Sequence, residues 1–173
     1  SFSGQSLFSV DMLMVLPIVG GSSGFSIITA HELIHRRKRW EQGLGRLLLC
    51  TVLYEHFYTE HLRGHHLRVG TPEDPATARF GESYEGFFRR TLPAQFRSAW
   101  DLERQRCGLE AGRRIRPAEW MRHRVAQGVC LQAGTILLLA FFLGPIAVAF
   151  HVTQALWAIT LLECVNYFEH WGL

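Results

Sequence analysis

Residues 125 to 165 read VAQGVCLQAGTILLLAFFLGPIAVAFHVTQALWAITLLECV, and they carry the strongest membrane signal in the chain. Apart from two cysteines, their only ionisable side chains are one histidine and one glutamate. A helix needs about 20 predominantly apolar residues to cross a bilayer core, so this stretch is long enough for two spans. Gly144-Pro145 is a turn signal near its middle. We therefore expect a hairpin of membrane helices at approximately residues 125–143 and 146–165.

A third apolar segment, residues 7–30, is also long enough to span a bilayer. The basic run Arg36 to Arg39 follows it, and the positive-inside bias places that end in the cytoplasm. Gly20, Gly21 and Gly24 indicate close contact with another helix, because small residues line membrane helix interfaces. A glycine-rich loop between two short helices is the alternative.

The intervening residues, 31–124, are predicted to be cytoplasmic or interfacial. The apolar run 44–54 has about 11 residues, which at 1.5 Å per residue reach only about half of a bilayer core. Residues 83–102 interleave aromatic side chains with arginines, which suits a helix in the headgroup region. An amphipathic helix packed on a soluble core is the alternative there. The fold class predicted is all-α, an integral membrane helical bundle.

The length and charge of the chain limit the classes of protein to which it can belong. The chain has 173 residues, the size of one domain, and 48% of them are hydrophobic. Its formal net charge of +3 comes largely from arginine, and no nucleic-acid-binding module can be read in it, so we expect no nucleic-acid partner. Because the sequence starts without a methionine and stops directly after a metal-type motif, we expect an internal fragment of a larger domain.

Six histidines in three short clusters outside the apolar spans are the candidate metal ligands: His31, His35, His61, His65, His66 and His170. Neutral imidazole offers a nitrogen lone pair near physiological pH. Six such rings exceed what one four-coordinate zinc can accept, which indicates two metal ions. An all-histidine site that oxygen can reach favours iron or copper, and zinc remains an alternative.

Helical spacing predicts how these rings are directed. Residues four apart share a helix face, so His31 and His35 can aim at one point, and His61 and His65 repeat the arrangement. His66 lies about 100° further round the axis, where it can reach a second ion or add a ligand to the first. The predicted hairpin returns the chain to the cytoplasmic side, so all three clusters share one face of the bilayer.

Carboxylates near the clusters are candidate partners, because a metal-bound histidine usually donates its other N–H to a carboxylate or carbonyl. Glu32, Glu55, Glu60 and Glu169 are candidates for this role or for occasional direct ligation, and solvated surface carboxylates are the alternative for each. No catalytic residue beyond the metal ligands can be identified.

Two interpretations from other classes compete with an oxygen-using centre. His31-Glu32-x-x-His35 matches the zinc protease motif, in which the glutamate is the general base. That interpretation leaves the histidines between residues 61 and 66 without a role. A non-catalytic membrane protein whose histidines merely bind metal is the other alternative.

The three motifs together resemble the membrane-bound fatty acid desaturase–hydroxylase superfamily, and within it the alkane 1-monooxygenase (alkane omega-hydroxylase) family. The matching text is HELIH at residues 31–35, HLRGHHLRVGTPEDPATARFGES at 61–83 and NYFEHWGL at 166–173. The resemblance implies one partial di-iron hydroxylase domain over residues 1–173. It also implies a further downstream HxxHH box, absent here, so the fragment alone should be inactive.

The resemblance further implies an enzyme of the bacterial inner membrane, with its active site on the cytoplasmic side. Such an enzyme uses O2 and two non-haem iron ions, held here by the six histidines, to hydroxylate the terminal methyl of medium-chain n-alkanes to 1-alkanols. Its electrons come from rubredoxin, which a rubredoxin reductase reduces, and its hydrocarbon substrate arrives through membrane lipid. We expect the basic stretch 89–124 to help dock that acidic donor.

Related boxes occur in xylene-type hydroxylases of aromatic methyl groups and in fatty acyl desaturases or hydroxylases. The ending at residues 166–173 resembles hydrocarbon hydroxylases more than desaturases. Trp171 stands where the family often has tyrosine, so the substrate stays open between alkane, aromatic methyl and acyl groups.

Overall fold

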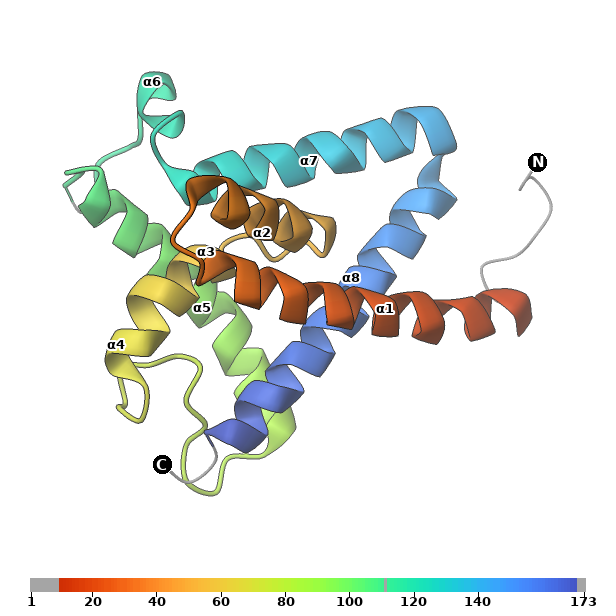
Figure 1. Cartoon of the computed structure of the whole chain (residues 1–173), viewed down its shortest axis with the longest axis horizontal. Helices are drawn as coiled ribbons and strands as arrows, with labels where there is room; N and C mark the ends of the chain where they lie inside the picture. Colours follow the sequence, from red (N-terminus) through yellow and green to blue (C-terminus); the bar gives the residue numbers. More distant parts are fainter. Residues whose placement is uncertain (1–9, 111, 171–173) are drawn as a thin grey trace.

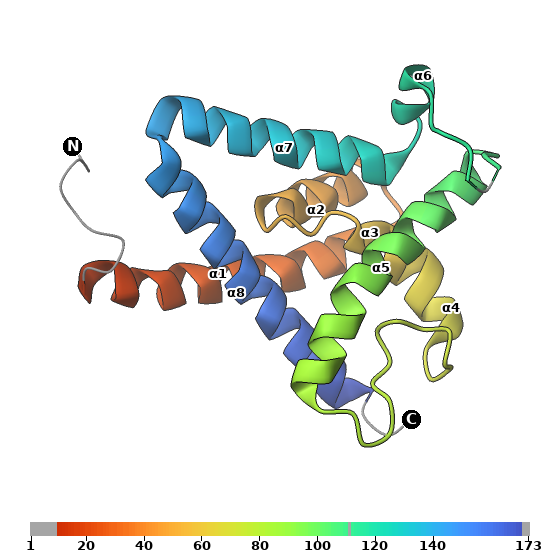
Figure 2. The same cartoon turned by 180° about the vertical axis from the view of Figure 1, so that it is seen from behind.

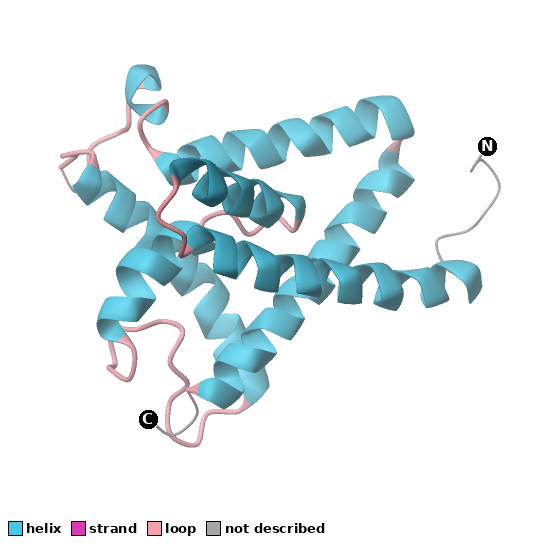
Figure 3. Cartoon of the chain, in the orientation of Figure 1, coloured by secondary structure: helices cyan, strands magenta, loops and turns pink. Residues whose placement is uncertain are grey.

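The computed structural model describes residues 10–110 and 112–170, and within these ranges it contains helices and no strand (Figures 1 and 3). The all-α prediction is therefore confirmed. The helices are α1 (Val10–Ile34), α2 (Arg39–Thr51), α3 (Phe57–Glu60), the π-helix η1 (His61–His65), α4 (His66–Arg68), α5 (Tyr84–Arg106), α6 (Pro117–Trp120), α7 (Arg124–Leu143) and α8 (Pro145–Glu169).

Helices α7 and α8 form a hairpin at one side of the molecule (Figures 1 and 2). Gly144 joins them with a φ of +82°, a conformation that glycine adopts without steric cost, and Pro145 starts α8. Both helices are long and apolar enough to cross a membrane. Only 17% of an 18-residue apolar stretch of α7 is buried inside the protein. Exposed Leu137 and Phe141 illustrate a surface that matches lipid rather than water.

Helix α1 crosses α8, and glycines allow the close approach (Figure 2). A Cβ added at Gly20 would lie 2.5 Å from the Trp157 ring, and one at Gly24 would lie 3.2 Å from Leu161. The expected contact is therefore confirmed at these two positions, whereas Gly21 has nothing within 4 Å. Because α1 is continuous through the glycines, the alternative of a loop is excluded; the expected range 7–30 starts outside the described residues.

Helix α2 has 13 residues, about 20 Å of rise, which is too short for a bilayer core of about 30 Å. It packs on the end of α1, where an added Cβ at Gly45 would lie 2.9 Å from the Ala30 carbonyl oxygen. Helix α5 begins after the Ser83 hydroxyl, which accepts a hydrogen bond from the Gly86 N–H, and it packs on α3, α7 and α8. Residues 83–102 therefore contact protein along much of their length.

The hydrophobic core lies where α1, α2, α3 and α8 meet. Ala30 and Ile34 of α1 are almost fully buried, as are Leu49 of α2 and Phe57 of α3. The histidines of the first two clusters directly adjoin these core segments in sequence. Packing of the core therefore sets the position of the histidine rings.

Candidate metal centre

Three imidazole nitrogens from two distant parts of the chain meet at one point. His31 lies in the last turn of α1, His35 follows its end, and His61 begins η1. The Nε2 atoms are 2.7 Å apart between His31 and His61, 3.2 Å between His31 and His35, and 3.1 Å between His35 and His61. The sequence prediction that distant histidines converge is therefore met by these three rings.

Hydrogen bonding alone cannot account for this triangle. The Nε2 atom of a neutral imidazole either carries one proton or offers one lone pair. Three mutually adjacent nitrogens can therefore form one full hydrogen bond between them; one other close pair faces like to like, and the remaining pair would need a proton or lone pair that is already used. A cation among them would satisfy all three lone pairs at once, so the donor set fits a metal ion.

The spacing also fits ligation. Nitrogen ligands about 2.1 Å from one ion lie about 3.0 Å apart at right angles and about 3.4 Å apart at tetrahedral angles. The observed separations of 2.7 to 3.2 Å lie closer to the first value. His66 Nε2 lies 3.0 Å from that of His61, beside the three rings whose nitrogens all lie within 4.8 Å of one another. Separations close to the right-angle value leave room for ligands beyond these three.

The π-helical turn η1 explains why His66 joins His61. In a π-helix the backbone hydrogen bond runs from residue i to residue i+5, so residues five apart come round to the same side. The His61 ring therefore lies near both rings, with centroids 5.4 Å from His65 and 4.4 Å from His66. The expected pairing of His61 with His65 is present, and His66 lies beside the same site.

His65 forms the second part of the site, together with His170. Its ring centroid lies 4.8 Å from that of His170, which caps the end of α8. The His65 Nδ1 donates to Asp74 Oδ2 at 2.9 Å, which leaves Nε2 with the free lone pair. The six histidines therefore form a group of three, His31, His35 and His61, with His66 beside His61, and a neighbouring pair, His65 and His170.

Asp74 is not among the carboxylates that the sequence analysis singles out, because it lies outside the histidine clusters, in the stretch TPEDP at residues 71–75. Its carboxylate is buried, and it also accepts hydrogen bonds from the Thr77 hydroxyl at 2.6 Å and the Ala76 N–H at 3.2 Å. Arg90 and Thr91 of α5 donate to the Pro75 carbonyl and so anchor the loop. An acidic residue nine positions after a ligand histidine, between two prolines, was the available signal.

The four glutamates considered from the sequence do not hydrogen-bond to a histidine anywhere in the described ranges. Glu60 is buried and accepts from Arg68 at 2.8 Å, and Glu55 is buried against Arg46. Glu32 and Glu169 are exposed. The first two therefore stabilise the helices around the site, and the partner carboxylate is Asp74 instead.

Burial keeps the cluster in the protonation state that metal ligands need. Burial and the neighbouring histidines lower the pKa of His61 to about 2. The pKa values of His31, His66 and His170 are also lowered, chiefly by burial. These rings are neutral at physiological pH, so their lone pairs are available to a metal.

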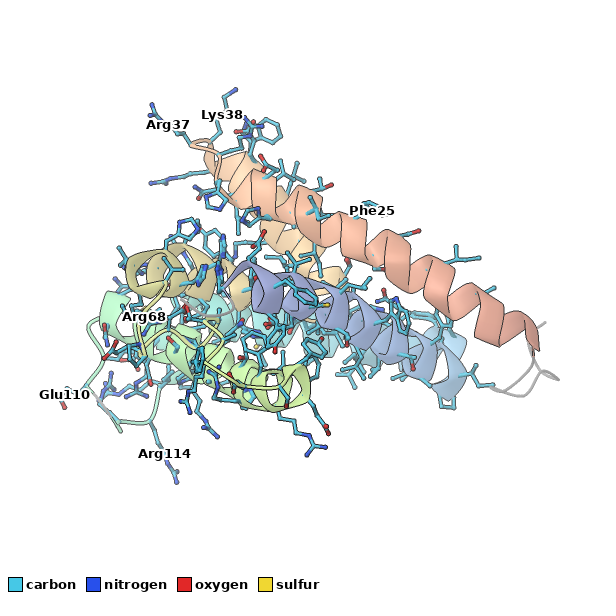
Figure 4. The ribbon with its side chains drawn as sticks, turned by 90° about the horizontal axis from the view of Figure 1, so that it is seen from below. Phe25, Arg37, Lys38, Arg68, Glu110 and Arg114 are labelled. Atoms are coloured by element: carbon cyan, nitrogen blue, oxygen red, sulfur yellow. The ribbon has the colours of Figure 1, made fainter. Side chains whose placement is uncertain are left out.

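Basic side chains lie next to the accessible edge of the site. His35 and His66 are exposed, and residues 36–39 follow directly on His35. Figure 4 shows Arg37 and Lys38 extending outward from the end of α1, while Phe25 projects from the apolar length of the same helix. One end of α1 thus suits an aqueous, anionic environment and the rest suits lipid.

Comparison with known proteins gives a consistent assignment. Residues 11–173 match the sequence profile described as fatty acid desaturase. The chain is 35% identical to alkane 1-monooxygenase 1 of Alcanivorax borkumensis over 99% of its length, and 38% identical to alkane 1-monooxygenase 2 of Pseudomonas aeruginosa over 90%. It is 26% identical to the xylene/toluene monooxygenase hydroxylase component of Pseudomonas putida over 83%.

The chain spans about two fifths of the length of these relatives, namely 41%, 40% and 38%. The two sequences named as alkane 1-monooxygenases and the one named as a xylene/toluene hydroxylase all align across most of the chain. The alignment with alkane 1-monooxygenase 1 covers 99% of the chain, so it includes the histidine motifs and the apolar helices.

Proposed function

Because this chain belongs to the fatty acid desaturase family, we propose that it forms part of a membrane monooxygenase that hydroxylates the terminal methyl of medium-chain n-alkanes. The observation that carries the proposal is the His31–His35–His61 triangle, whose lone pairs no internal hydrogen-bond pattern can satisfy. The relatives named alkane 1-monooxygenase supply the reaction class.

The proposed cofactor is a pair of non-haem iron ions. His31, His35 and His61 would hold one ion, with His66 beside them, and His65 with His170 would contribute to the second. Bound iron would supply the activation of O2 that removal of hydrogen from an unactivated C–H bond requires. The other ligands of the second ion would come from the part of the relatives that this chain does not span.

The chain's own residues position and insulate the site. Asp74 holds the proton of His65 on Nδ1, so that Nε2 faces His170 with its lone pair. The core residues Ala30, Ile34 and Phe57 exclude water from the inner side of the triangle. The lipid-facing surfaces of α7 and α8 would keep the site beside the phase in which hydrocarbons dissolve.

Three other functions compete with alkane hydroxylation, and the observations favour them to different degrees. A xylene-type hydroxylase stays the second candidate, since the xylene/toluene component aligns over the same region at lower identity. A fatty acyl desaturase or hydroxylase is less favoured, because the relatives reported above are named as hydrocarbon oxygenases. The zinc protease alternative needs three ligands, which His31, His35 and His61 could supply, but it is disfavoured because it gives no role to His65, His66 and His170.

We also propose rubredoxin as the electron donor and the cytoplasmic side of the bacterial inner membrane as the location of the site. Several arginines of residues 89–124 are engaged internally: Arg90, Arg104, Arg106 and Arg113 donate to oxygens of the same chain. Arg97, Arg114 and Arg122 are exposed and form no salt bridge within the described ranges, and Figure 4 shows Arg114 extended from the ribbon. Neutralising these three should weaken donor coupling most strongly at low salt.

The test uses the full-length protein in membranes. We expect two iron ions per chain and conversion of octane to 1-octanol, with both lost in His61→Ala. The matched control is His151→Ala, a histidine of α8 outside the cluster, which should retain iron and activity. One zinc per chain without iron, or hydroxylation that persists in His61→Ala, would refute the proposal.

A further inference from the structure

A buried tyrosine–carboxylate pair lies behind the histidine cluster and has no role in the proposed iron ligation. Tyr54 is 2% exposed, and its hydroxyl donates to Glu163 Oε1 at 2.7 Å. A second acceptor, Gln95 Oε1, lies 2.9 Å from the same hydroxyl. Glu163 is fully buried and also accepts from the side-chain amides of Gln95 and Asn166. Each of these neighbours can donate a hydrogen bond to an oxygen of Glu163.

Packing of the core does not by itself require a hydroxyl group on the side chain at position 54. A phenylalanine would fill the same core position without the cost of burying a hydroxyl and a carboxylate. Burial raises the pKa of Tyr54 well above its usual value, so the phenol stays protonated. A protonated phenol loses an electron readily only when a base within hydrogen-bond distance takes the proton, and Glu163 is such a base.

Stacked rings connect Tyr54 to the metal ligands. The Tyr54 and Phe57 centroids are 5.8 Å apart with 24° between the ring planes, and those of Phe57 and His61 are 4.7 Å apart with 20° between them. His61 is the ring whose nitrogen contacts those of His31, His35 and His66. Tyr54 is therefore one intervening ring away from the proposed iron site.

The same rings continue outward to the surface. The centroid separations are 4.5 Å from Tyr54 to His56, 5.2 Å from His56 to Phe96 and 6.1 Å from Phe96 to Trp100. Trp100 lies 6.2 Å from Trp120, which is 37% exposed in α6. In Figure 2, α6 lies beyond the end of α5, so the rings lead from the interior to an edge of the molecule.

We propose that Tyr54, Trp100 and Trp120 form a relay that carries oxidising equivalents from the histidine cluster to the surface when no hydrocarbon is present to consume them. The inference rests on the proposed function, which supplies an O2-derived oxidant at iron. Its role is protection, because an unspent oxidant would otherwise attack the ligand histidines and the surrounding core.

Each step of the relay moves one electron, and only the oxidation and reduction of Tyr54 also move a proton. Tyr54 gives one electron to the oxidant, its O–H bond breaks, and the proton binds Glu163 Oε1, which leaves a neutral phenoxyl radical and a carboxylic acid. Trp100 then returns one electron to Tyr54 while Glu163 returns the proton, which leaves a tryptophan radical cation. Trp120 reduces Trp100, and a soluble one-electron reductant of the ascorbate or thiol class reduces Trp120. One electron crosses the relay, with no net proton transfer.

The first experiment needs neither iron nor hydroxylation. Full-length metal-free protein with ring-deuterated tyrosine is illuminated with ruthenium tris-bipyridine and persulfate, which oxidises surface side chains, and is then frozen for electron paramagnetic resonance. We expect a deuterium-sensitive tyrosyl signal that Tyr54→Phe abolishes and Trp100→Phe lowers severalfold. Glu163→Gln should slow formation of the radical by about a hundredfold, since it removes the proton acceptor.

The matched control is Tyr58→Phe. Tyr58 is also buried, but its hydroxyl contacts the Gln42 amide rather than a carboxylate, and the signal should persist in this variant. A signal of wild-type size in Tyr54→Phe, or an unchanged yield in Trp100→Phe, would overturn the relay.

The second experiment tests protection in the iron-loaded protein. Wild type and Trp100→Phe are incubated with reductant and O2 in the absence of hydrocarbon, and the surviving activity is followed over time. We expect Trp100→Phe to lose activity severalfold faster although its initial hydroxylation rate is unchanged, and equal survival would contradict protection. Absence of hydroxylation in the wild type would refute the proposed function, while the photochemical result would still decide the relay.

Discussion

Replacing Asp74 by asparagine should disturb one half of the metal site and leave the other intact. The carboxylate accepts from His65 Nδ1 and the Thr77 hydroxyl through Oδ2, and from the Ala76 N–H through Oδ1. Asparagine has a single acceptor oxygen. If that oxygen faces His65, the new amide N–H groups meet the Ala76 N–H, and a buried donor left unpaired costs about 1–3 kcal/mol.

The other orientation of the asparagine side chain is no better for the metal. The amide would then donate toward His65 Nδ1, and the imidazole would carry its proton on Nε2, where the metal needs a lone pair. Loss of such a partner typically weakens metal affinity about 10- to 100-fold, or about 1.4–2.7 kcal/mol. The His31–His35–His61 triangle makes no contact with Asp74 and should keep its ion.

The assay is competitive metal titration of the full-length protein in detergent, together with nitrogen-15 NMR of the histidine rings in metal-free protein. We expect weaker binding of one ion out of two and a change of the His65 tautomer. Asp101→Asn is the matched control, because it makes the same chemical change at an exposed position of α5. If Asp74→Asn binds both ions as tightly as Asp101→Asn, then Asp74 does not orient His65.

Two further predictions concern stability, both measured as thermal unfolding in detergent. Gly45→Ala should destabilise the protein by about 1–3 kcal/mol, since the new Cβ would lie 2.7 Å from the Ile34 side chain. Gly43 has nothing within 4 Å of an added Cβ, so Gly43→Ala should stabilise the helix by about 0.5–1 kcal/mol. Equal effects of the two would show that α1 and α2 are not closely packed. Burial raises the pKa of Glu55 to about 7, despite the opposing charge of Arg46. Between about pH 4.3, the pKa of an unperturbed glutamate, and pH 7, the native state therefore binds more protons than the unfolded state. Stability should fall by at most about 1.4 kcal/mol per pH unit as pH rises through this range, and Glu55→Gln should remove the fall. Parallel pH profiles for wild type and variant would contradict this assignment.

Much of the architecture follows from local composition. The apolar stretch 125–165 can satisfy its backbone in lipid only as helices, and Gly144-Pro145 supplies both the positive φ and the helix start that a tight hairpin needs. The shortness of α2 excludes a further crossing. These features depend on neighbours in sequence, so they can be predicted without knowledge of the tertiary structure.

The histidines show where such prediction ends. Their number, type and spacing identify six candidate ligands and a shared face. Their arrangement depends on a π-helical turn, which brings His66 beside His61 while His65 lies between His61 and His170. Spacing rules assume α-helical geometry, and a single inserted π-turn changes which side chains meet.

The partners of the site depend on contacts between distant segments. Asp74 reaches His65 because α5 holds the loop that carries it, and Tyr54 reaches Glu163 across a separation of 109 residues. Composition and periodicity report only which side chains avoid water and which repeat along a helix. Which buried donor meets which buried acceptor is decided when the helices pack, because every buried polar group must then find a partner among whatever the fold brings to it.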